Sequence, residues 1–123
     1  MVLIWNETDF LEYLEVEPTL EDEYDYCYSY VKKCTQSLRL ELTIYPYSGD
    51  IYISLFHESL EWSIFDIVMR DCPGARVVND KRGNYIEFAE SNCFTNRYDG
   101  ESVIPYGVRL FVKPQIHIEL FAA

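Results

Sequence analysis

Carboxylates are concentrated in the first quarter of the chain, where their negative charge could bind cationic groups. Nine Asp and Glu precede Lys32, the first basic residue, so residues 1–31 carry a formal charge of −9. The whole chain of 123 residues carries −11, which leaves only −2 for residues 32–123. The nine acids are Glu7, Asp9, Glu12, Glu15, Glu17, Glu21, Asp22, Glu23 and Asp25.

Tyrosines follow these acids at every second position, from Tyr24 to Tyr30. This alternation places the four rings on one face of a strand. Such a face is either a core layer with its hydroxyls at the rim or an exposed patch, since Tyr is enriched at protein interfaces. Because carboxylates beside aromatic rings suit a basic protein surface, the sequence predicts a partner-binding site. Its residues are Glu17, Glu21, Asp22, Glu23, Tyr24, Asp25, Tyr26 and Tyr28.

The acidic segment also has plainer interpretations. Carboxylates are favourable near a helix N-terminus and keep a surface soluble, so part of the charge needs no partner. Calcium binding fits less well, because the run from Glu21 to Asp25 lacks the alternating oxygen ligands and central glycine of a helix–loop–helix site.

The sequence predicts no catalytic, metal or cofactor site. The two histidines, His57 and His117, and the four cysteines show no spacing that defines a Cys–His nucleophile pair. No two cysteines are separated by two residues, as zinc knuckles and thioredoxin-type motifs require. A small thiol hydrolase is therefore only a remote alternative.

Length and charge restrict the class of protein. A chain of 123 residues is expected to form a single domain, residues 1–123, with its own core. An isoelectric point near 4.4 disfavours nucleic acid and anionic membranes as ligands, because like charges repel. The first residues lack the basic region of a signal peptide, so a cytoplasmic location with reduced thiols is expected.

Periodicity predicts the elements of the first half. Asn6 is a suitable N-cap for a helix over 6–15, which Pro18 would end. Strict alternation predicts strands over 24–33 and 37–45, and a third strand beginning at Ile51. A stripe of polar residues at spacings of four, three and four predicts a buried helix over 58–71. The stripe is Ser59, Ser63, Asp66 and Arg70. The polar segment 15–23 is expected to be mobile.

The second half reads as strands. Residues 76–78 and 85–88 flank a turn at 80–84 and predict a hairpin, and 91–101 reads as a loop. Alternation over 108–113 and 116–120 indicates either one strand bent at Pro114 or two strands meeting there. The predicted fold class is α+β, an antiparallel sheet in the order α-βββ-α-ββ-ββ with two helices packed on it.

These observations predict a small acidic protein-binding domain, most simply an immunity protein or inhibitor. It would neutralise a basic toxin or nuclease by occluding the cationic site that such an enzyme needs to hold phosphate. The order of elements over 6–90 also resembles the small acidic chaperones of bacterial effector secretion, although the strand-rich segment 105–121 departs from their closing helix. That resemblance implies a dimer that binds an extended effector segment. The sequence leaves the oligomeric state open.

Overall fold

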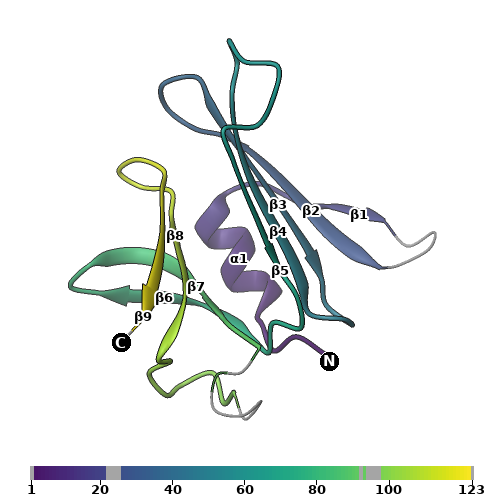
Figure 1. The fold of residues 1–123 in the computed structure, drawn as a ribbon, viewed down its shortest axis with the longest axis vertical. Coiled ribbons are helices and arrows are strands. Elements are labelled where there is room, and N and C mark those ends of the chain that lie inside the picture. The colour runs from purple at the N-terminus through teal and green to yellow at the C-terminus, as the bar shows by residue number, and fades with distance from the viewer. Residues whose placement is uncertain (1, 22–25, 92, 94–97, 123) are drawn as a thin grey trace.

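The computed structural model describes residues 2–21, 26–91, 93 and 98–122, and in them the fold is mostly β. One short helix, α1 (Glu7–Leu14), accompanies nine strands in two antiparallel sheets (Figure 1). The five-stranded sheet comprises β1 (Thr19–Glu21), β2 (Cys27–Lys33), β3 (Leu38–Tyr45), β4 (Asp50–His57) and β5 (Phe65–Met69). The four-stranded sheet comprises β6 (Ala75–Asp80), β7 (Gly83–Ala89), β8 (Tyr106–Phe111) and β9 (His117–Ala122). Strands are adjacent in chain order in both sheets.

Helix α1 lies between the two sheets (Figure 1), and its local sequence explains both ends. The side-chain oxygen of Asn6 accepts a 3.0 Å hydrogen bond from the backbone of Asp9, as an N-cap does. Glu15 ends the helix in a left-handed conformation with φ 60°. Phe10 and Leu14 are fully buried. The prediction of a helix over 6–15 is confirmed.

The two sheets enclose one main core around this helix. In the five-stranded sheet, Leu42 of β3 faces Ile53 of β4 in register, and both side chains are completely buried. In the four-stranded sheet, Ile86 of β7 is paired with Leu110 of β8, and both are likewise completely buried. The ring of Phe10 contacts Tyr30 of the five-stranded sheet and Phe88 of the four-stranded sheet. Alternation therefore identified the buried residues Leu40, Leu42, Ile44, Ile51 and Ile53 of β3 and β4 correctly. In β7 the burial does not alternate, because Tyr85 to Ala89 are all buried.

The predicted helix over 58–71 is wrong. Residues 58–64 form an exposed loop between β4 and β5, and β5 pairs with β4 so that Ile53 faces Ile67. The polar stripe that suggested a helix has another origin: Ser63 donates a 2.6 Å hydrogen bond to Asp66, and Arg70 forms a 2.9 Å ion pair with Asp50. Alternating Phe65, Ile67 and Met69 satisfy the period of a strand equally well, and pairing with β4 decides between the two.

Two further expectations need correction, and the structure decides one alternative that the sequence left open. The described strands form two sheets, where a single sheet carrying two helices was predicted. Part of the segment expected to be mobile is the edge strand β1, which pairs with β2 through Leu20 and Tyr28. At Pro114 the chain turns, so β8 and β9 are two antiparallel strands. None of these follows from periodicity, because partner choice between strands is a long-range property.

Candidate protein-binding surface

An acidic surface follows helix α1 and the edge strand β1. The side chains of Glu12, Glu17 and Glu21 are exposed and form no hydrogen bond or ion pair with any other described residue. All three residues of β1 are exposed, and Leu20 between the acids is 53% exposed. Carboxylates and an apolar side chain thus share one sheet edge, where main-chain groups are also free to accept a partner.

Glu7 has a structural role instead. It accepts a 2.6 Å hydrogen bond from the hydroxyl of Tyr28, which in turn accepts a 3.4 Å bond from Tyr26. Burial raises the pKa of the Tyr28 hydroxyl, and the hydrogen bond to the Glu7 carboxylate raises it further. The ring of Tyr28 also packs edge-on against Trp5 at a centroid distance of 4.9 Å. The hydrogen bond between Tyr28 and Glu7 joins α1 to the five-stranded sheet.

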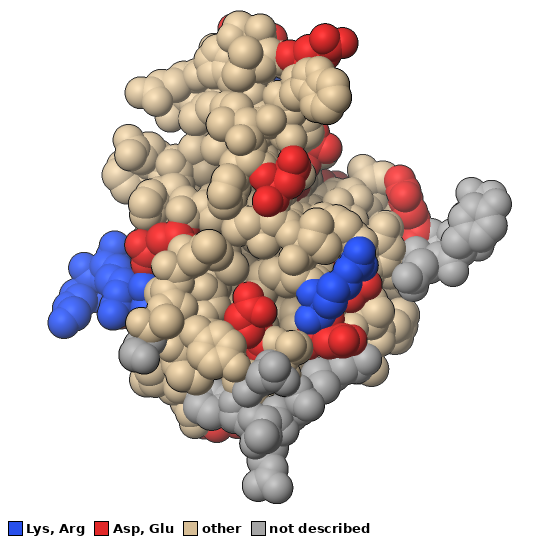
Figure 2. Space-filling view, viewed as in Figure 1, with Lys and Arg blue, Asp and Glu red and all other residues tan. Residues whose placement is uncertain are grey.

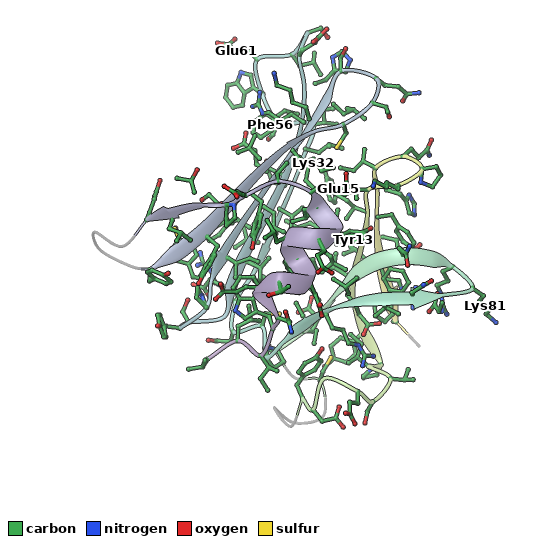
Figure 3. The ribbon with its side chains drawn as sticks, turned by 180° about the vertical axis from the view of Figure 1, so that it is seen from behind. Tyr13, Glu15, Lys32, Phe56, Glu61 and Lys81 are labelled. Carbon is green, nitrogen blue, oxygen red and sulfur yellow. The ribbon has the colours of Figure 1, made fainter. Side chains whose placement is uncertain are left out.

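The far end of α1 is attached to the four-stranded sheet. Glu15 forms an ion pair with Lys113, which lowers the pKa of its carboxyl, and the more distant charge of Lys32 adds to the effect (Figure 3). Tyr13 donates a 2.8 Å hydrogen bond to the backbone oxygen of Asn84 and accepts a 3.2 Å bond from the backbone of Val112. Helix α1, which carries part of the acidic surface, is therefore attached to both sheets.

The structure separates the predicted site residues into three groups. Glu17 and Glu21 are exposed, as a contact surface requires. Tyr26 is half-buried and Tyr28 is only 7% exposed, so a partner that leaves this conformation intact does not reach the Tyr28 ring. The remaining predicted residues lie outside the described part of the chain: Asp22, Glu23, Tyr24 and Asp25.

Ion pairs within the chain neutralise the described arginines. Every arginine that the structure describes is paired with a carboxylate, at donor–acceptor distances of 2.7–3.1 Å. The pairs are Arg39–Glu41, Arg70–Asp50, Arg76–Glu87, Arg82–Asp80 and Arg109–Glu119. Figure 2 shows Asp and Glu side chains on the upper tip and right flank of this face. With the described arginines paired, the net charge of −11 gives the molecule a negative field. Such a field attracts a basic partner.

Sequence reasoning missed the loop between β4 and β5. Trp62 is 80% exposed there, and Leu60 and Ile64 are exposed as well. The signal was present, because Leu, Trp and Ile alternate with Glu and Ser across the loop, but the predicted helix assigned these apolar residues to the core. Exposed large apolar side chains in a cluster mark interaction sites more often than isolated ones do.

Chemical groups elsewhere are arranged as follows. A hollow of about 620 Å³ is lined by Arg82, Arg109, Lys113 and His117, together with Glu119. Burial raises the pKa of the Cys72 thiol to about 12.

Among the described residues, no cysteine hydrogen-bonds to a histidine and no three His, Cys, Asp or Glu are grouped to hold a metal. No described helix has the length and apolar character needed to cross a membrane.

Comparison with known proteins gives one informative match. No protein-family model and no curated protein matches the chain. The fold is similar to a chain of a contact-dependent growth inhibition toxin–immunity protein complex from Klebsiella pneumoniae 342. The TM-score is 0.77 and the identity 17%, over 99% of this chain and 98% of that chain. The match establishes a shared fold with one component of that complex, either the toxin or the immunity protein.

Proposed function

We propose that the chain is an immunity protein, which binds a basic toxin and occludes its cationic site. The observation that carries the proposal is the charge layout: the described arginines are neutralised internally, while Glu12, Glu17 and Glu21 remain exposed and unpaired. The shared fold with a chain of a toxin–immunity complex supports it.

The charge favours the immunity role over the toxin role. A toxin that cleaves nucleic acid must present free cations to phosphate, whereas this chain carries a net charge of −11. The hollow lined by Arg82, Arg109 and Lys113 is largely neutralised, because Arg82 pairs with Asp80 and Arg109 pairs with Glu119. The four cysteines are free thiols, in keeping with action in the cytoplasm.

The mechanism is electrostatic capture followed by occlusion. The acids of α1 and β1 accelerate encounter with a cationic surface, since a field of one sign raises association rates by about 10- to 1,000-fold at low salt. In the complex, Glu17 and Glu21 contact Lys or Arg side chains beside the toxin's active site, and Leu20 and Tyr26 pack against apolar atoms around them. Substrate is excluded because these carboxylates occupy the place of its phosphates.

Co-purification from the native host identifies the partner by mass spectrometry. We expect one stoichiometric basic protein whose toxic activity is lost in the complex. A mixed set of unfolded clients and a dimeric chain would instead support the secretion-chaperone alternative. Loss of an activity in both His57→Ala and His117→Ala would support the hydrolase alternative.

Association kinetics test the acidic surface. The double charge reversal Glu17→Lys/Glu21→Lys should slow association about tenfold at low ionic strength, because it removes attraction and adds repulsion. Glu90→Lys/Glu101→Lys changes the net charge equally, away from this surface, and should slow it much less. Association rates that stay constant between low and physiological salt would contradict steering by the acids.

A further inference from the structure

The loop of residues 58–64 between β4 and β5 presents apolar side chains at one tip of the molecule. Figure 3 shows Glu61 of this loop at the end remote from α1. Trp62 is 80% exposed, Leu60 55% and Ile64 50%. Exposing these side chains forfeits about 1.5–3 kcal/mol each relative to burial. These apolar side chains therefore contribute little to the stability of the fold. Their presence in the loop is better explained by contact with another molecule.

Hydrogen bonds hold the loop in one conformation. The backbone of Ile64 donates to the oxygen of Leu55 at 2.7 Å, and that of Leu60 to His57 at 3.0 Å, so both ends are closed. Asp66 accepts from Ser63 at 2.6 Å and from Ser54 at 2.7 Å. A loop fixed before binding loses less conformational entropy on association, which favours its use as a contact surface.

The loop and the strand that follows it carry only acidic charge, although Lys33 and Arg39 of the neighbouring strands lie beside Glu58, and Arg39 is paired with Glu41. Residues 57–69 contain Glu58, Glu61 and Asp66 but neither Lys nor Arg. Glu61 and Asp66 have no cationic partner among the described residues, and the hydrogen bonds from Ser63 and Ser54 lower the pKa of the Asp66 carboxyl. A second copy of the chain would bring these carboxylates against each other, so self-association through this loop is disfavoured.

A hollow lies directly beside the loop. Leu55 and Phe65 line it from the five-stranded sheet, and Ile116, His117 and Ile118 line it from the start of β9. Its volume is about 230 Å³, enough for one apolar side chain of a partner. The loop thus projects an aromatic ring, and the strand ends at its base offer an apolar recess. An exposed ring and an apolar recess are the two complementary parts of an interface core.

We propose that the loop 58–64 is the anchor of the complex with the basic protein partner. This inference rests on the proposed function and adds a second contact, distinct from the acidic surface of α1 and β1. Trp62 fills an apolar pocket of the partner, and Lys or Arg side chains at the rim of that pocket pair with Glu58 and Glu61. The acidic surface governs the rate of encounter, whereas the loop governs the lifetime of the complex.

Panning a random-peptide display library on the full chain tests the surface without a known partner. We expect enriched peptides that combine Lys or Arg with aromatic or aliphatic residues. Their affinity should fall about 30-fold or more in Trp62→Ala, as at a binding hot spot. Leu120→Ala removes another side chain that is 70% exposed and should have no effect. Lack of enrichment, or equal affinity for Trp62→Ala, overturns the inference.

The purified toxin complex separates this inference from the proposed function. We expect Trp62→Ala and Glu58→Lys/Glu61→Lys to raise the dissociation rate about tenfold or more while thermal stability is unchanged. If these variants dissociate like the wild type while Glu17→Lys/Glu21→Lys still slows association, the anchor is wrong and the function stands. If the loop selects peptides but the chain inhibits no toxin, the surface stands and the immunity role is lost.

Discussion

The hydrogen bond between Tyr28 and Glu7 shows that one tyrosine can belong to the core while its strand borders the exposed acidic strand β1. The hydroxyl reaches a carboxylate 2.6 Å away on α1, and the ring is buried among Trp5, Tyr26 and the helix. Its neighbour Tyr30 is 2% exposed. For these two rings, the interpretation as a core-facing layer is the one that the structure supports.

Buried tyrosines predict instability at alkaline pH. Burial, and then the charge of Glu7, raise the pKa of Tyr30 from 10.0 to about 12, and burial raises that of Tyr98 to about 12. The unfolded chain loses these protons first, so the stabilisation is complete below about pH 10 and is lost as pH rises to about 12. Urea unfolding across this range should show a falling free energy, with a shallower fall in Tyr30→Phe. A constant free energy would contradict the assignment.

Helix α1 connects the two sheets mainly through the side chain of Phe10. Phe10 is completely buried and contacts Trp5 at 5.1 Å, Phe88 of β7 at 6.3 Å and Tyr30 of β2 at 6.4 Å between ring centroids. We expect Phe10→Ala to lower the free energy of unfolding by about 3–5 kcal/mol, since it leaves a cavity that neither sheet can close.

Chemical denaturation measures this loss, and the adjacent residue supplies the control. Leu11 is 39% exposed, so Leu11→Ala should cost well below half as much. Equal losses of unfolding free energy for the two variants would show that Phe10 is not the main contact between the helix and the sheets.

Local patterns revealed the elements whose period was unambiguous. Asn6 with its helical run, and the strict alternation of Leu38 to Ile44, predicted α1 and β3 within a residue or two. Residues 58–71 satisfied two periods at once, and only the pairing of β5 with β4 decides between them. The edge strand β1 has three residues, too few for any period. The division into two sheets depends on which strands find each other, which no local window contains.

The candidate site was predictable to a similar degree. Charge counting predicted Glu17 and Glu21 as contact residues, because uncompensated acids are visible in any sequence, and the structure shows that both are exposed. Burial within a strand was not visible, so Tyr28 was placed with the exposed residues although it is packed. The exposure of Trp62 could not be predicted either, since a large apolar residue is ordinarily assigned to the core.

Across the whole molecule, the net charge of −11 predicts how stability depends on salt. Raising NaCl from about 10 mM to about 150 mM shortens the Debye length from about 30 Å to about 8 Å and screens repulsion among the acids. The ion pairs of the described residues are mostly exposed and contribute little, so their weakening is minor. The midpoint of urea unfolding should therefore rise with salt. A fall would show that ion pairs outweigh the repulsion.

The position of the loop 58–64 outside the core has an evolutionary consequence. Trp62 is 80% exposed and Leu60 55%, so substitutions there remove little buried surface and carry a small penalty for folding. A lineage can therefore exchange these side chains one at a time while the two sheets and α1 stay intact. With the proposed anchor in this loop, recognition of a new partner and preservation of the fold become separate problems, which selection can solve independently.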